Sequence, residues 1–188
     1  MILAESPFLR TCKAEIERLL GITQHETAAA TQTMVRIEPD DRAPSDAAIT
    51  FIAVCPGGTM PGPRHNTAGG IYDLVYAVDV VVFRRITNVP ADRHVDPFLY
   101  HSDALNATVE QVIAALDYSM AWLDRVNELL EDEAAGEQGF LEALKFTSID
   151  PKPRVVTGAD YGADQREPRA GMKRRITFGD ARRIHTRS

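Results

Sequence analysis

IYDLVYAVDVVVFRRI, from Ile71 to Ile86, is the strongest β-strand signal in this 188-residue chain, and we expect the other elements to pack around it. Alternate side chains of a strand point to opposite faces. One face is apolar and carries Leu74, Tyr76, Val78, Val80 and Val82. The other is mixed and carries Asp73, Val75, Ala77, Asp79, Val81 and Phe83. The apolar face is therefore predicted to pack against a helix, and the mixed face to meet water or a second subunit. Because its 16 residues exceed a usual strand of about 5–6, the segment also predicts a bent strand or a protruding hairpin arm.

Two amphipathic segments are predicted to supply the helices. Apolar residues recur near a 3.6-residue period from Pro7 to Leu20. A second stripe with the same period runs from Leu105 to Leu130, with Ser102 or Asp103 as its N-cap and a kink near residues 117–119 that divides it in two. We expect this long central helix to cover the sheet.

The remaining strands are shorter. Thr33–Ile37 and Ala48–Val54 favour β structure, and the turn-rich residues between them predict an antiparallel hairpin. Three closing strands are predicted at Phe140–Ile149, Arg154–Tyr161 and Gly171–Phe178. The order of elements predicts a single α+β domain over residues 1–188: an antiparallel or mixed β-sheet with an N-terminal helix and a long central helix packed on one face, plus an extended loop or β-arm.

A glycine- and proline-rich segment follows the second strand. PGGTMPGPRHNTAGG, residues 56–70, holds five glycines and three prolines, which exclude a helix or a regular central strand. It lacks the GxxxxGK[ST] and GxGxxG patterns of phosphate-binding loops. We therefore interpret it as a long exposed interface loop. Its candidate contact residues are Pro56, Gly57, Gly58, Arg64 and His65.

The charge of the chain is divided unevenly. Residues 169–188 contain seven basic residues and one acid, a charge of +6, so the rest of a chain with net charge −6 carries −12. A basic strand and tail on an acidic body predict a partner of opposite sign, either nucleic acid or acidic protein. Acidic protein is favoured, because Phe178 alone could stack on bases. The candidate contact residues are Lys173, Arg174, Arg175, Arg182 and Arg183.

Residues suited to chemistry form weak patterns. Asp92, His94, Asp96, His101 and Asp103 could ligate a divalent metal, but helix capping and solvated loop positions explain them as well. The two cysteines, Cys12 and Cys55, have no CxxC spacing and are expected to be reduced and buried. No nucleophile lies in a GxSxG context. We therefore expect no enzyme, no cofactor and no metal site.

The chain is expected to be neither secreted nor membrane-spanning. Its apolar runs are too short to cross a bilayer, and its N-terminal residues lack the pattern of a signal peptide.

The order of these elements resembles that of the tail terminator, or tail-completion (neck), proteins of long-tailed bacteriophages. The resemblance is carried by the helix Pro7–Leu20, the hairpin, the strand IYDLVYAVDVVVFRR, the helix beginning LNATVEQVIAAL and the closing strands ending in KRRITF. It covers most of the chain and consists of element type and order. The chain is longer than is usual for that family, and the 15-residue Gly/Pro loop is unusual there.

This resemblance implies a structural protein of the virion tail or neck, assembled in the host cytoplasm. Such proteins form hexameric rings that cap the tail tube, stop its polymerisation and join it to the head–neck connector, without catalysis or cofactor. The implied partners are further copies of the chain, the tail tube protein and the connector proteins; contact with DNA in the lumen stays open. A sibling role in neck or head completion fits the same features.

Two functions of other classes compete with this one. A nucleic-acid-binding accessory protein would use the basic C-terminus, and its binding would fall steeply with salt. A metal-dependent hydrolase would use His94, Asp96, His101 and Asp103, and a chelator would abolish its activity.

Overall fold

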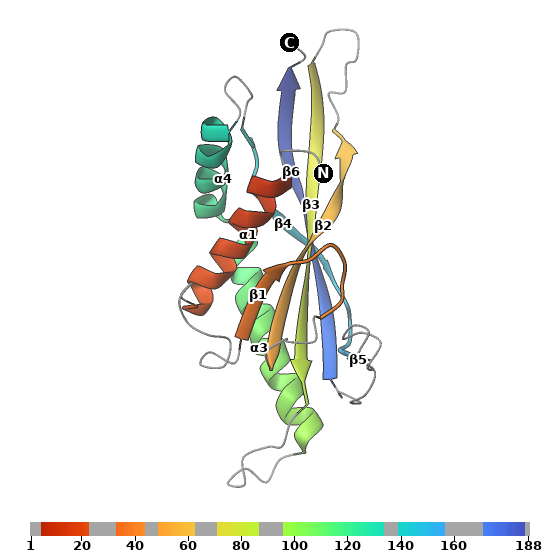
Figure 1. The fold of residues 1–188 in the computed structure, drawn as a ribbon. Helices are drawn as coiled ribbons and strands as arrows, with labels where there is room; N and C mark the ends of the chain where they lie inside the picture. The colour runs from red at the N-terminus through yellow and green to blue at the C-terminus, as the bar shows by residue number, and fades with distance from the viewer. Residues whose placement is uncertain are drawn as a thin grey trace.

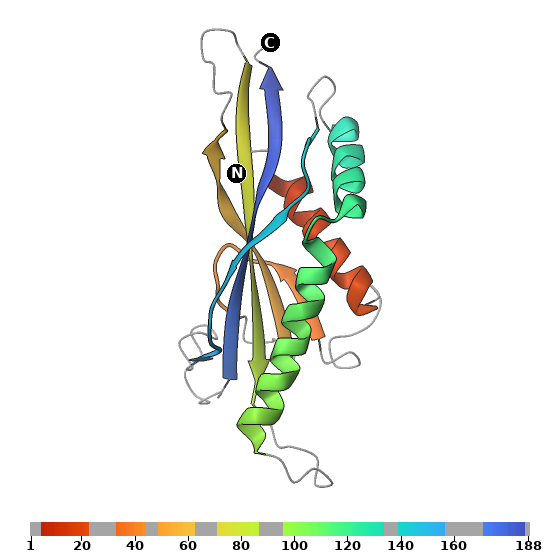
Figure 2. The same ribbon diagram turned by 180° about the vertical axis from the view of Figure 1, so that it is seen from behind.

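The computed structural model describes residues 5–22, 33–43, 49–62, 71–86, 96–133, 139–156 and 171–186. Their fold is α+β, as predicted, with a mixed sheet of six strands and helices packed on one of its faces (Figures 1 and 2). The helices are α1 (Glu5–Leu20), α3 (Pro97–Leu116) and α4 (Met120–Glu133). The strands are β1 (Thr33–Ile37), β2 (Thr50–Pro61), β3 (Ile71–Arg85), β4 (Lys145–Ile149), β5 (Arg154–Val156) and β6 (Gly171–Thr186).

The long strand β3 lies in the middle of the sheet. The strand order is β1-β2-β3-β6-β4, and β5 also pairs with β6. β3 is antiparallel to β2 on one side and to β6 on the other, where pairing runs from Ile71 opposite Thr186 to Arg85 opposite Gly171. Its predicted apolar face is confirmed, because Tyr76, Val78, Val80 and Val82 are buried in the main core and Leu74 packs against it.

The main core lies between the helices and the sheet. Phe8 of α1 meets Trp122 of α4 edge-on with ring centroids 5.4 Å apart, and Tyr76 meets Phe140 in the same way at 5.1 Å. Such pairs contribute about 0.5–1.5 kcal/mol beyond the burial of their area. Trp122 Nε1 donates a hydrogen bond to Cys12 Sγ at 3.2 Å, which satisfies the buried indole N–H.

The opposite face of the sheet carries a second, smaller core. We call this face, which the helices do not cover, the far face. Its buried apolar residues are Ala43, Phe51, Ala53, Cys55, Val81, Phe83 and Val156.

The predicted hairpin of the first two strands is wrong. β1 and β2 are parallel, with Thr33 opposite Thr50 and Ile37 opposite Val54. Parallel strands need a crossover of about a dozen residues, and residues 38–49 supply it. The described part of this connection turns onto the far face, where Ala43 is buried and the Cys55 thiol donates to the carbonyl oxygen of Asp40 at 3.0 Å. The turn-forming residues therefore begin a crossover.

The central helix begins earlier than predicted and is divided as predicted. Asp96, and not Ser102 or Asp103, is the N-cap of α3: its Oδ1 accepts the backbone N–H groups of residues 98 and 99 at 2.8 and 3.3 Å. Pro97 at the first helical position needs no partner for an N–H and favours this start. The expected kink is confirmed, because α3 ends at Leu116 and α4 begins at Met120.

β2, β3 and β6 extend together into an arm, which we define as Pro56–Pro61 of β2 with residues 71–77 of β3 and 180–186 of β6 (Figure 1). The protruding arm is thus confirmed, but two boundaries were wrong. Residues 56–61 are strand and not loop, since a bulge between Pro56 and Gly58 and an edge position accommodate their prolines and glycines. β6 continues past Phe178 to Thr186 and carries the basic residues into the sheet.

The other two closing strands are shorter than predicted. β4 begins at Lys145, and Phe140 forms only an isolated bridge to Arg183. β5 covers Arg154–Val156, and the rest of its predicted span, residues 157–161, lies outside the described residues.

Candidate assembly surface

The arm presents the outer edge of β2. β1 pairs with β2 as far as Val54, where the N–H of Glu38 donates to the Val54 carbonyl at 3.0 Å. Within the described residues, no strand pairs with the outer side of Pro56–Pro61. Met60 on this edge is 64% exposed. An exposed strand edge with an apolar side chain is a surface on which another chain can pair.

Three of the residues predicted for an interface lie on this edge. Pro56, Gly57 and Gly58 are exposed at the bulge. A Cβ on Gly57 would lie 2.8 Å from backbone atoms of Ala77 and Val78, so glycine is needed for the two strands to approach at the bulge. The other two predicted residues of this segment, Arg64 and His65, lie outside the described residues. Met60 was missed, because the segment was interpreted as a loop.

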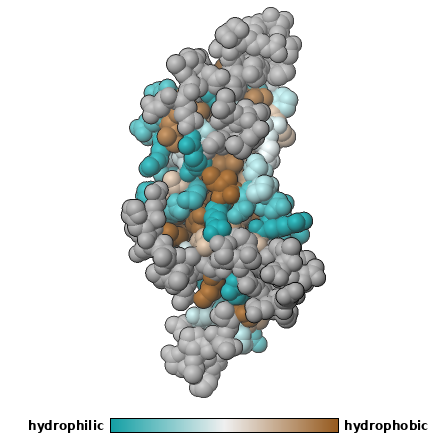
Figure 3. All heavy atoms as spheres, viewed as in Figure 1, coloured by the Kyte–Doolittle hydropathy of each residue, from teal (hydrophilic) through white to brown (hydrophobic). Residues whose placement is uncertain are grey.

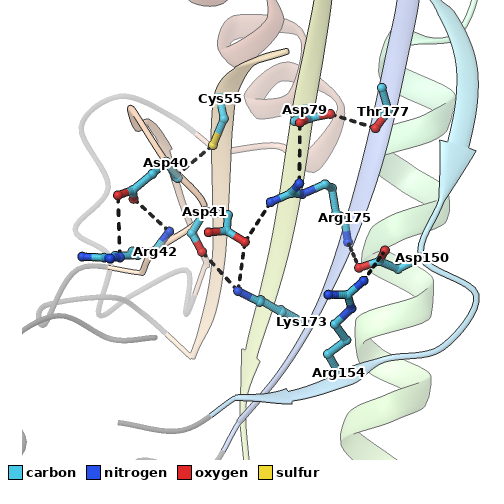
Figure 4. Close-up of polar contacts among 10 residues, drawn as sticks. All are labelled: Asp40, Asp41, Arg42, Cys55, Asp79, Asp150, Arg154, Lys173, Arg175 and Thr177. Atoms are coloured by element: carbon cyan, nitrogen blue, oxygen red, sulfur yellow. Dashed lines mark hydrogen bonds and ion pairs between the residues drawn. The ribbon is translucent and has the colours of Figure 1, made fainter. Parts of the chain in front are cut away.

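The basic residues of β6 meet acids of the same chain on the far face (Figure 4). Asp41 Oδ2 accepts from Lys173 Nζ at 3.1 Å and from Arg175 Nη2 at 2.8 Å. Arg175 also lies 4.0 Å from Asp79, whose Oδ1 accepts the hydroxyl hydrogen bond of Thr177 at 2.8 Å. This group of two cations and two carboxylates has no net charge.

The pKa of Asp41 responds to these cations. Burial alone would raise the pKa, but the hydrogen bond and charge of Lys173, followed by those of Arg175, outweigh burial and hold it below its ordinary value. The Asp41 carboxyl is therefore ionised in the folded chain at neutral pH. It neutralises much of the field that Lys173 and Arg175 would otherwise present to a phosphate.

The other three cations of β6 are also engaged within the chain. Arg174 points to the helical face and donates to the Asp150 carbonyl at 2.7 Å and to Asn106 of α3 at 2.9 Å. Arg182 donates through Nε and Nη2 to Asp73 Oδ2 at 3.0 and 2.6 Å. Arg183 is fully buried, with its guanidinium carbon 6.0 Å from the Phe140 ring centre.

The basic strand is therefore largely neutralised inside the molecule. The sequence contains a signal for this, because the acids Asp73 and Asp79 stand in an otherwise apolar strand. In the sheet, each lies diagonally across from its cation in the antiparallel β3–β6 pair. Pairing these two strands could have identified the β3 partners of Arg175 and Arg182.

The residues considered for a metal site do not converge. Asp96 caps α3, Asp103 is exposed on that helix, and buried His101 accepts a hydrogen bond from Arg84 Nε at its Nδ1, 3.3 Å away. Asp92 and His94 lie outside the described residues. Among the residues that the structure describes, no three His, Cys, Asp or Glu side chains gather into a candidate site.

Both cysteines are buried and free within the described structure, as predicted. Burial raises the pKa of the Cys12 and Cys55 thiols to about 12. A thiol with such a pKa is protonated at neutral pH and is a poor nucleophile.

A second exposed apolar group lies where α3 meets α4 and the sheet edge. Tyr118, Met120 and Phe146 are 63%, 61% and 38% exposed. The corner is fixed by the N–H of Tyr118 donating to the Leu144 carbonyl and by the N–H of Phe146 donating to Asp117 Oδ1, both at 2.8 Å. Tyr118 has φ 52°, a left-handed conformation that costs a non-glycine residue free energy. In the view of Figure 3, too, apolar residues form separate groups between hydrophilic ones.

No helix in the described part of the chain is long and apolar enough to cross a membrane. No protein-family model and no curated protein matches the chain. Among solved structures, the chain is similar to one from a structure described as "Virion of native gene transfer agent (GTA) particle", with 16% sequence identity and a TM-score of 0.35. That match covers 89% of this chain and 93% of the other. At this identity and TM-score it adds no weight to any function.

Proposed function

We propose that the chain is a structural assembly subunit of a phage-like particle, acting as a tail terminator. In this role copies of the chain form a hexameric ring that caps the tail tube and joins it to the head–neck connector. The role includes no catalytic step and no cofactor. The chain would be a component of the virion tail or neck. The proposal rests on the element order described above and on the surfaces that the fold exposes.

The observation that carries the proposal is the pair of different surfaces at opposite edges of the sheet. The arm presents the outer edge of β2 with Met60, and the α3–α4 corner next to edge strand β4 presents Tyr118 and Phe146. A head-to-tail ring needs two unlike surfaces on each subunit, one for each neighbour. The two edges meet this requirement.

The charge arrangement favours protein partners over nucleic acid. The cations predicted for phosphate contact hydrogen-bond to acids or carbonyls of the same chain, or are buried in its core. A phosphate would have to displace Asp41 or Asp73 to reach Arg175 or Arg182. An assembly protein needs no such displacement.

The experiment is electron microscopy of tail tubes polymerised from a candidate tube protein with and without this chain. The proposal predicts tubes that end in a ring and stop growing when the chain is present. Met60→Asp should abolish the effect, because it buries a charge at the contact. Val155→Asp is the matched control for the β2 edge, since Val155 is equally exposed, at 67%, but lies on β5 at the opposite edge of the sheet. There β5 pairs with residues 171–173 of β6, beyond the 176–179 stretch that pairs with β4 and Phe146.

The outcome against the proposal is equally specific. Tubes that grow to the same lengths with and without the chain would contradict a terminator role. If the chain then bound duplex DNA with an affinity that fell by a factor of roughly 10³ between about 50 and 200 mM salt, the nucleic-acid function would replace it.

A further inference from the structure

Arg84, near the end of β3, is a half-buried cation whose contacts in the fold are not acids. It lies on the helical face of the sheet, because it alternates along the strand with the core residues Val80 and Val82. Its Nε donates to Nδ1 of His101 at 3.3 Å, and its Nη1 donates to the hydroxyl of Thr50 at 2.5 Å. Among the residues that the structure describes, no carboxylate forms an ion pair with Arg84.

Burial makes this arrangement costly for the free chain. It lowers the pKa of the Arg84 guanidinium from its ordinary value, and the charge of Tyr100 opposes that effect more weakly. A cation withdrawn from water is stabilised by an opposite charge, as Arg182 is by the carboxylate of Asp73. The remaining nitrogen of Arg84, Nη2, hydrogen-bonds to no described residue and is not enclosed by the fold. It can therefore donate to an acceptor that arrives from outside.

The first turn of α3 projects past the end of β3, next to this cation (Figures 1 and 2). Phe98, His101 and Leu105 have the spacing of one helix face. His101 and Leu105 are buried on it, whereas Phe98 is 44% exposed because the strands end before this turn. Leu99 beside it is 58% exposed. Phe98 thus lies one turn from the histidine that Arg84 contacts, and we call Arg84, Phe98 and Leu99 the α3 ledge.

The chemistry of the α3 ledge favours a protein partner over a nucleic acid. Binding to a phosphate backbone depends on several accessible cations, and here one recessed guanidinium stands beside two apolar side chains. Arginine and aromatic residues in such partly desolvated positions are typical of the energetically dominant contacts of protein interfaces. A guanidinium forms its strongest hydrogen bonds with a carboxylate.

We propose that the α3 ledge binds an acidic segment of a partner protein, in which a carboxylate pairs with Arg84 and a neighbouring apolar side chain packs on Phe98. The ledge and the arm lie at opposite ends of the molecule (Figure 1). The 20 residues of α3, about 30 Å of helix, separate the ledge from the corner at Tyr118. The proposal therefore goes beyond the contacts between ring neighbours, because it adds a third surface that leaves both sheet edges free.

The test is fluorescence anisotropy with a labelled pentapeptide of alternating leucine and glutamate and with its glutamine counterpart, at about 50 mM salt. We expect the glutamate peptide to bind about tenfold more tightly, because glutamine forms no charge-assisted pair. Arg84→Gln keeps an amide donor for Thr50 but removes the charge, so it should abolish this preference. Phe98→Ser should weaken both peptides alike, since it removes the apolar contact. Arg154→Gln, the same change at an arginine that is 68% exposed, should change neither affinity.

Two results in the wild-type chain would overturn the proposal without any variant: equal affinities for the two peptides, or no binding of the glutamate peptide at about 1 mM. An Arg84→Gln chain with native circular dichroism that keeps the tenfold preference would also overturn it, because the acidic peptide would then bind elsewhere. Duplex DNA that binds the wild-type chain and not Arg84→Gln would replace the protein partner by a nucleic acid. These measurements need neither a tube nor a ring, so their outcome is independent of the terminator role.

Discussion

Arg182→Ala tests whether the basic strand is an internal structural element. Arg182 donates two hydrogen bonds to Asp73, at 3.0 and 2.6 Å, and Asp73 is fully buried. The other carboxylate oxygen, Oδ1, has no hydrogen-bond partner among the described residues. Removing the guanidinium therefore leaves a buried carboxylate without a partner. Breaking a buried pair in this way costs about 3–5 kcal/mol of unfolding free energy.

The assay is urea unfolding followed by circular dichroism. With a slope of about 2–3 kcal/mol/M, the midpoint should fall by roughly 1–2.5 M. Arg154→Ala is the matched control. The Arg154 side chain is 68% exposed, so its ion pair with Asp150 should contribute less than about 1 kcal/mol to stability. Replacing both Asp73 and Arg182 by leucine should recover most of the loss, because no unpaired charge is left. An Arg182→Ala midpoint within the error of the Arg154→Ala midpoint would refute the reasoning.

Three further predictions concern charge, packing and thiol reactivity. Asp41→Asn should lower stability at pH 7 by up to about 1 kcal/mol. Because the pKa of Asp41 is lowered in the fold from its ordinary value of 3.8, this difference should shrink as the pH falls below that ordinary value, so unfolding should show a smaller difference at pH 3 than at pH 7. Gly57→Ala should destabilise by about 1–3 kcal/mol in thermal unfolding, since its Cβ would meet β3 backbone at 2.8 Å; an unchanged melting temperature would contradict the bulge. Cys12 and Cys55 should react slowly with a thiol reagent at pH 8 in the native protein and rapidly in denaturant, because burial raises the pKa of each to about 12.

Strands and helices were predictable where the apolar period of the sequence matches the side that is buried in the fold. The alternation in residues 71–86 identified the core face of β3, since the described helices α1, α3 and α4 pack on that side of the sheet. The helical period in α1 was equally clear. The N-cap of α3 at Asp96 was missed although its signal is local, because an Asp-Pro pair marks a helix start as well as Ser102 would.

The errors in strand pairing came from contacts distant in sequence. Nothing local distinguishes a hairpin from a crossover between β1 and β2, because that choice depends on Ala43 and Asp40 packing on the far face. The Gly/Pro segment was taken for a loop because its strand character depends on pairing with β3 at an edge.

For the candidate site, too, local composition was informative and distant contacts were not predictable. The basic residues of β6 were found from composition, but the acids that they hydrogen-bond come from β3 and from the β1–β2 connection, 109–134 positions away. The charge of +6 on the last twenty residues predicts a separate partner of opposite sign, whereas in the fold Lys173 and Arg182 pair with Asp41 and Asp73 of the same chain.

The central claim is that this chain functions by assembly, and its most direct test is the molar mass by light scattering, alone and with candidate tube and connector proteins, at low and high salt. We expect a closed oligomer, or a stable complex with those proteins, that Met60→Asp disrupts and Val155→Asp does not. A chain that stays monomeric with every such protein, while binding DNA in a salt-sensitive way, would contradict it.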